Sequence, residues 1–239
     1  MSATVDRSQL PPGPKAPRSF QTVGLSYRQR PYLERQRRKY GETFTVQILG
    51  FVPLVVVTNP EHIKQVFTAD AKTLIVLRHA KAGWPDAADD HARPLAERGH
   101  AQAPAAGDWL REHDLVPDAV VCSDALRTRQ TCVWVCERLG ELAPTPYLDP
   151  RLYGADAARA LAVVNETEET TRRLLVVGHM PWVQELGMRL MSLDSDQDAA
   201  LRMSEHYPTL GMQVFRVEKP WAELDGRDAA LTHFVVPGR

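Results

Sequence analysis

The stretch TLIVLRHAKA, Thr73 to Ala82, decides the fold and places the candidate site. Its first five residues are an unbroken run of β-branched and aliphatic side chains, typical of a strand buried on both faces of a parallel sheet. The run leads directly to Arg78 and His79. Because ligands of open α/β sheets bind beyond the carboxyl ends of the strands, a cation and an imidazole lie where a substrate would bind. One dipeptide is a weak signal, since His79 could equally end the strand while Arg78 extends into solvent.

Two further strands are expected to end beside the first one. An apolar run from Leu174 to Val177 leads to His179, and a shorter run from Ala119 to Cys122 precedes a helix. Ser123 is expected to cap this helix, which places Arg127 one turn from its start. Because the N-terminus of a helix favours anions, the imidazoles and guanidinium groups at these strand ends predict an anion pocket.

The order of these motifs resembles that of the histidine phosphatase superfamily, the phosphoglycerate mutase-like group. Three motifs carry the resemblance: RHA at Arg78, SxxxRxxxT at Ser123 and GH at Gly178. Two more, RPLxxxG at Arg93 and PTxG at Pro208, resemble motifs of the SixA branch, the phosphohistidine phosphatases. The resemblance covers roughly residues 72–237, and it is specific because the motifs occur together and in order.

The resemblance implies a fold and a mechanism. The fold would be α/β, with three layers (α/β/α) and a mostly parallel sheet, as strands alternating with helices also predict. His79 would be the nucleophile that takes the phosphoryl group, while Arg78 and Arg127 would hold its oxygens. His179 would donate to a phosphoryl oxygen and is therefore expected to be partly protonated. Arg93 is expected to bind substrate. No metal and no cofactor are expected, because fixed cations supply the positive charge.

The leaving group bears on the choice of substrate. Many members of the wider family carry a Glu or Asp general acid after the arginine helix, where this chain has Asp149 and then Pro150. Asp149 is a candidate acid. A phosphoramidate needs less help than an ester, because its leaving nitrogen protonates readily. A phosphohistidine on a protein is therefore the favoured substrate. The alternatives are a small-molecule phosphomonoester phosphatase or mutase, and a non-catalytic phospho-ligand-binding fusion product.

Residues 1–70 differ from the rest of the chain. They carry 10 Lys and Arg against 5 Asp and Glu, while the remainder carries 19 against 25. A PPGP segment, a helix over 28–40, strands over 43–49 and 54–57, and a helix from Asn59 to near Phe67 resemble the amino-terminal part of haem-thiolate cytochrome P-450 monooxygenases. That family's cysteine loop, which ligates haem, does not occur here. We expect a small, non-functional α+β fragment (1–70) fused to a phosphatase domain (71–239).

The composition limits the kinds of binding partner expected for this chain. The net charge is −1 over 239 residues, so no nucleic-acid partner is expected. No run of about 18 apolar residues and no export signal is found, so a cytoplasmic protein without a membrane partner is expected. The three cysteines are expected to be reduced core residues. The Asp-rich loop over 86–91 is expected to be solvated and not a metal site.

The remaining elements follow from apolar periodicity and from breakers. We expect a helix over 95–113 that kinks at Pro104, a short strand over 144–148, and helices over 155–164 and 182–191. Residues 194–198 are expected to form an acidic loop, and 212–217 and 231–236 a closing pair of strands.

Overall fold

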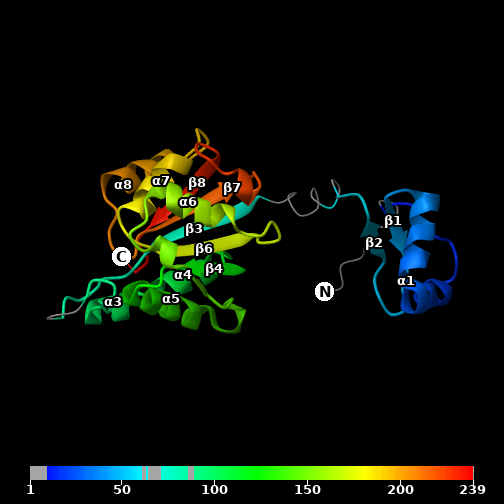
Figure 1. Cartoon of the computed structure of the whole chain (residues 1–239), viewed down its shortest axis with the longest axis horizontal. Coiled ribbons are helices and arrows are strands. Elements are labelled where there is room, and N and C mark those ends of the chain that lie inside the picture. Colours follow the sequence, from blue (N-terminus) through cyan, green and yellow to red (C-terminus); the bar gives the residue numbers. More distant parts are fainter. Residues whose placement is uncertain (1–9, 61–62, 64–70, 86–88, 239) are drawn as a thin grey trace. The chain divides into compact units, whose positions relative to one another are not determined.

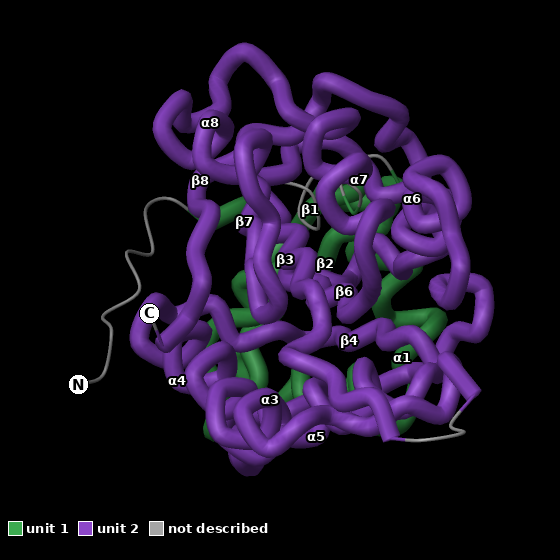
Figure 2. The backbone as a smooth tube through the Cα atoms, turned by 90° about the vertical axis from the view of Figure 1, so that its left-hand side faces the viewer, with its two compact units in different colours: residues 1–69 green, residues 70–239 purple. Residues whose placement is uncertain are grey.

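A computed structural model describes residues 10–60, 63, 71–85 and 89–238 of the chain. The chain divides into two compact units, residues 1–69 and 70–239 (Figure 2). The helix predicted from Asn59 lies largely outside the described residues. No helix in the described part is long and apolar enough to span a membrane.

The second unit is built on a six-stranded sheet with the order β5-β4-β6-β3-β7-β8 (Figure 1). Strands β3, β4, β5 and β6 run parallel, and β7 runs antiparallel to both of its neighbours, β3 and β8. Their bounds are Lys72–Arg78 (β3), Ala119–Cys122 (β4), Tyr147–Leu148 (β5), Arg173–Gly178 (β6), Met212–Val217 (β7) and Ala229–Val235 (β8). The mostly parallel α/β fold predicted from the alternating pattern is confirmed.

The central strand β3 contributes to two separate cores, one on each face of the sheet. Leu74 and Val76 belong to one buried cluster, whereas Ile75 and Leu77 belong to the other. Helices α6, α7 and α8 cover the first face, and α3, α4 and α5 cover the second (Figure 1). Their bounds are Glu97–Gln102 (α3), Pro104–Glu112 (α4), Leu126–Leu139 (α5), Ala157–Asn165 (α6), Trp182–Leu190 (α7) and Gln197–Glu205 (α8). Burial on both faces explains the continuous apolar run in β3.

Two predictions are refined by the structure. The helical segment expected over 95–113 is interrupted at Pro104, where the kink was predicted: α3 ends at Gln102, and Pro104, which has no amide hydrogen to continue α3, begins α4. The acidic loop expected over 194–198 ends at Asp196, because helix α8 begins at Gln197: the Asp196 side chain accepts a hydrogen bond from the Ala199 amide and caps the helix. The last two residues of the expected loop therefore belong to α8.

The carboxyl ends of β3, β4 and β6 are joined by backbone hydrogen bonds. The amide of His79 donates to Gly178, and that of Ser123 donates to Val177. These bonds place the first residues after the three strands next to one another. Gly178 has no room for a side chain, because a Cβ there would lie 1.8 Å from the Trp182 ring. The end of β6 is thus packed tightly against the start of α7.

The first unit consists of helix α1 (Arg18–Tyr40) and a hairpin of β1 (Thr43–Val46) and β2 (Leu54–Val57). The helix starts ten residues before the expected Arg28, which instead has non-helical angles (φ −142°, ψ 53°) and marks a kink. The Gln21 side chain fixes helix to hairpin: its amide donates to Pro14 and Ala16, and its oxygen accepts from the Gln47 amide.

Candidate functional site

Two imidazoles meet at the carboxyl edge of the sheet. His79 follows β3 and His179 follows β6, and their ring centroids are 5.2 Å apart. Both residues are buried, at 9% and 6% exposure. The sequence placed these two residues at adjacent strand ends, and the structure brings their side chains together.

His79 is held in one neutral form. Its Nδ1 lies 2.7 Å from the carbonyl oxygen of Ala80, and because a carbonyl only accepts, Nδ1 carries the proton. The Nε2 lone pair is then free. Burial, followed by the charges of Arg127 and Arg78, lowers the pKa of His79 to about 4 although the Ala80 bond opposes this shift. The ring is therefore a neutral nucleophile near pH 7.

Ser123 orients His179 and does not cap helix α5. The helix begins at Leu126 with Ala125 as its N-cap and has no side-chain cap, so the predicted role of Ser123 is wrong. The Ser123 hydroxyl instead lies 2.8 Å from Nε2 of His179. An N-cap is predicted from the few residues that follow it in the sequence. Such a prediction cannot identify His179 as the partner of Ser123, because the two are 56 residues apart.

His179 is not protonated in the free protein. Burial, together with the neighbouring His79 and Arg127, lowers the pKa of His179 to about 3. The partly protonated ring expected from the sequence is therefore not the form of the free protein, because desolvation outweighs the nearby negative charge of Asp90. Its Nδ1 is buried and has no hydrogen-bond partner among the described residues.

Arg78 is anchored by the backbone of the loop before β7. Its Nη1 donates to the carbonyl of Tyr207 over 2.5 Å, and the Tyr207 hydroxyl in turn donates to Val76. The Nε of Arg78 is buried and unpartnered within the described part of the chain. A guanidinium fixed at one edge retains donors for an anion.

Arg127 and Arg93 converge on a carboxylate from the loop after β3. Arg127 donates to the carbonyl and the side chain of Asp90, and Arg93 donates to the other oxygen of the same side chain. Tyr153 also donates to Asp90. Residues 86–88 lie outside the described residues, but Asp90 is a bound group and not part of a merely solvated loop, which corrects that prediction.

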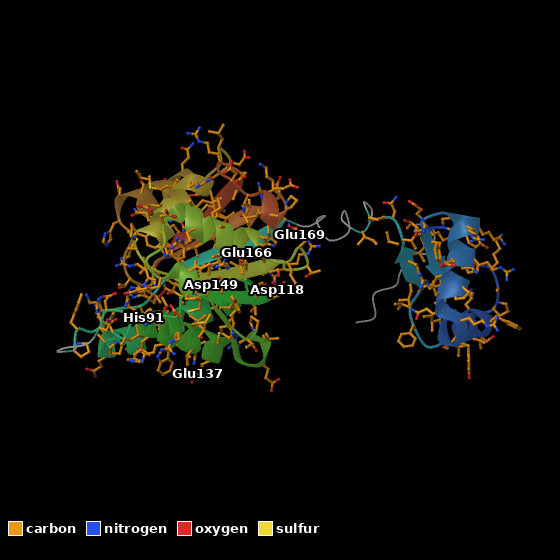
Figure 3. All side chains as sticks on the ribbon, in the orientation of Figure 1. His91, Asp118, Glu137, Asp149, Glu166 and Glu169 are labelled. Atoms are coloured by element: carbon orange, nitrogen blue, oxygen red, sulfur yellow. The ribbon has the colours of Figure 1, made fainter. Side chains whose placement is uncertain are left out.

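His91 lies on the same loop, next to Asp90 (Figure 3). Its Nε2 is 3.0 Å from Asp124, and its ring contacts that of Tyr153 edge-on at 4.7 Å. The Tyr153 ring is in turn 5.7 Å from that of His179. The loop after β3 therefore reaches the histidine pair through one aromatic side chain.

Asp149 does not suit the role of proton donor. Its side chain is 1% exposed, and both oxygens accept from Arg151, which also binds Glu166 (both acids are labelled in Figure 3). Hydrogen bonds from the Arg151 side chain are the main cause of its lowered pKa. A carboxyl held as the anion gives up no proton near pH 7.

The cysteines and the acidic residues form no metal centre in the described part of the chain. No three His, Cys, Asp or Glu side chains there are grouped to hold an ion. Cys132 and Cys136 lie with their sulfurs 3.9 Å apart, and neither they nor Cys122 form a disulfide. The pKa values of the Cys132 and Cys136 thiols are raised, by the hydrogen bonds between cysteine sulfurs and by burial, so these two thiols stay protonated.

The first unit has a different relative from the second. The putative cytochrome P-450 135A1 of Mycobacterium tuberculosis is 42% identical over 66 residues, which are 27% of this chain and 15% of that protein. The match is to the amino-terminal part of that protein. The likeness expected for residues 1–70 is confirmed.

The second unit matches a family of phosphatases. The sequence profile of the histidine phosphatase superfamily (branch 1) matches residues 74–157. The uncharacterized protein Rv1276c of Mycobacterium tuberculosis is 43% identical over 162 residues, 67% of this chain and 99% of that protein.

Solved structures of phosphatases are also similar to the second unit. The structure of a putative phosphohistidine phosphatase SixA from Nakamurella multipartitia is 33% identical, with a TM-score of 0.63, over 71% of this chain and 98% of that one. The protein histidine phosphatase SixA complexed with tungstate, 22% identical, shares the fold with a TM-score of 0.56 over 69% of this chain and 97% of that one. The chain therefore belongs to the histidine phosphatase superfamily.

Proposed function

We propose that this protein is a metal-independent phosphatase that uses His79 as its nucleophile and acts on phosphohistidine carried by a protein. The observation that carries the proposal is the free Nε2 lone pair of His79, fixed by the Nδ1 bond to Ala80 and kept unprotonated by burial. A buried neutral imidazole beside fixed cations suits attack on phosphorus.

The reaction has two steps. In the first, Nε2 of His79 attacks the phosphorus, the new P–N bond forms, and the bond to the leaving nitrogen breaks. In the second, water attacks this phosphohistidine, releases inorganic phosphate and returns the electron pair to His79. Arg78, Arg127 and Arg93 hold the phosphoryl oxygens through both steps, because guanidinium groups match their charge and geometry.

His179 acts as a neutral donor in this mechanism. The Ser123 hydroxyl can donate to Nε2 of His179, which keeps the ring proton on Nδ1. That Nδ1 has no partner among the described residues and can donate to a phosphoryl oxygen. In this tautomer the neutral ring donates from Nδ1 while Nε2 accepts from Ser123, and no protonation of the buried ring is needed.

The leaving group favours a phosphoramidate over an ester. Asp149 is tied to Arg151 and supplies no proton, whereas an alkoxide leaving group needs a proton donor. The leaving imidazole of a phosphohistidine protonates more readily. The solved structure with 33% identity is named a putative phosphohistidine phosphatase, which supports the same substrate class.

Residues 1–70 take no part in this chemistry. The side chains assigned roles here all lie between Arg78 and His179. The match of the first unit covers only 15% of the monooxygenase, so no haem function is carried over. We regard the first unit as an appended fragment and residues 71–239 as the phosphatase domain.

A substrate panel tests the proposal. The purified chain is given a histidine-phosphorylated protein, p-nitrophenyl phosphate and 3-phosphoglycerate, with the His79→Asn variant as control. We expect the highest kcat/KM with the phosphoprotein and no turnover by the variant. Faster turnover of 3-phosphoglycerate would favour a small-molecule phosphatase or mutase, and no turnover of any substrate would favour a phospho-ligand binder.

A further inference from the structure

We propose that the Asp90 carboxylate is an internal anion that occupies Arg127 and Arg93 in the free enzyme and competes with the phosphoryl group. Asp90 thereby sets the affinity for substrate and speeds the release of phosphate. The inference rests on the proposed function, because it assumes that these arginines bind the phosphoryl group.

Arg127 directs both terminal nitrogens at Asp90. Its Nη1 donates to the Asp90 carbonyl over 2.5 Å, and its Nη2 donates to Oδ2 over 3.1 Å. The Arg127 side chain is 8% exposed. The outer edge of this buried guanidinium, the edge that suits an oxyanion, is therefore already filled by Asp90.

The rest of the Asp90 carboxylate is bound like a ligand. Oδ1 accepts from Nη1 of Arg93 over 2.8 Å, and Oδ2 accepts a second bond, from the Tyr153 hydroxyl, over 2.8 Å. Two cations and a phenol thus hold one carboxylate. These bonds keep the pKa of Asp90 well below its usual range, so the group is an anion at every working pH.

The cations are fixed, whereas the carboxylate is the exposed partner. Arg93 is 11% exposed, donates its Nε to Gly83 and lies over the Trp84 ring, while the Asp90 side chain is 49% exposed. A phosphoryl group carries more charge and more acceptor oxygens than a carboxylate. It can therefore replace Asp90 on Arg127, and two anions sharing the site would repel each other.

This exchange has a kinetic consequence. Inorganic phosphate held by fixed arginines would leave slowly, and the return of Asp90 to Arg127 assists its departure. The Asp90→Asn variant keeps the shape of the side chain but loses its negative charge. Phosphate then no longer has to displace an anion from Arg127. We expect this variant to bind phosphate about tenfold more tightly, which corresponds to about 1.4 kcal/mol.

Calorimetric titration of the full chain with inorganic phosphate tests the inference. The matched control is Asp89→Asn, which makes the same charge change one residue away at a side chain bonded only to the His91 amide among the described contacts. We expect its affinity to stay within about twofold of the wild type. Tyr153→Phe removes one bond that holds Asp90 and should tighten phosphate binding in the same direction by a smaller factor. It also provides a second test if Asp90→Asn does not fold.

The titration distinguishes this inference from the proposed function. If Arg127→Ala abolishes phosphate binding while Asp90→Asn and Tyr153→Phe leave it unchanged or weaken it, Asp90 positions Arg127 and does not compete, and the inference is overturned. If Arg127→Ala binds phosphate as tightly as the wild type, Arg127 is not an anion site, and both proposals are wrong.

Discussion

Replacing either buried histidine should make unfolding of the second unit less sensitive to acid. His79 and His179 have pKa values of about 4 and about 3 in the fold, against an ordinary value near 6.5 in an unfolded chain. Between those values the unfolded chain binds two protons that the folded chain excludes. Stability from these groups is therefore full above pH 6.5 and is lost as the pH falls toward 4.

The size of the effect follows from the fraction of each imidazole that is protonated in the unfolded and in the folded chain. Between pH 6 and 5 each unfolded imidazole is largely protonated, while each folded one is largely neutral. At about 1.4 kcal/mol per proton and pH unit, each histidine lowers the free energy of unfolding by about 1 kcal/mol over this step. The pair contributes about 2 kcal/mol, so His79→Asn or His179→Gln should halve that contribution and the double variant should remove it.

Urea unfolding in phosphate-free buffer at pH 6 and pH 5 measures these differences. All five tryptophans lie between Trp84 and Trp221, so their fluorescence follows the second unit alone. The change in unfolding free energy between the two pH values is compared across variants, which cancels the other titrating groups. If the free energy of unfolding changes equally with pH in the wild type and the double variant, the two histidines are not held in the neutral form by burial.

Three further predictions concern activity. Arg127→Ala should lower kcat/KM by about 10²-fold or more, because a fixed cation at the phosphoryl group is lost; wild-type kinetics would remove Arg127 from the mechanism. Activity should survive dialysis against EDTA, since the arginines supply the charge, whereas a loss restored by Mg²⁺ or Zn²⁺ would contradict this. A chain that begins at Ala71 should retain specific activity within about threefold, because Lys72 is already buried against Glu169 and Trp221 at the start of the phosphatase fold; an unfolded product would show that residues 1–70 belong to it.

The sequence predicted the site residues that come directly after buried strands. Unbroken apolar runs mark β3 and β6 as buried parallel strands, and the carboxyl ends of such strands lie at one edge of the sheet. His79 and His179 could therefore be placed together without coordinates. Motif order then indicated the family, because several weak motifs in one order are jointly specific.

The parts that were missed depend on contacts between distant residues. Ser123 has the residue type and position of a helix cap, and only the fold shows its hydroxyl beside His179. Asp90 stands in a polar, Asp-rich loop, and its contact with Arg127 spans 37 residues. The protonation of His179 was predicted from expected charge, whereas burial decides it. Local patterns carry no information about desolvation or about such partners.

Trapping the phosphoenzyme tests the central claim most directly. The chain is mixed with a phosphoryl donor labelled with radioactive phosphorus, quenched in alkali, which preserves phosphohistidine, and digested for mass spectrometry. We expect one labelled residue, His79, with no label in His79→Asn and retained label in the matched His91→Asn variant. Label on another residue, or full turnover by His79→Asn, would contradict the assignment of His79 as the nucleophile.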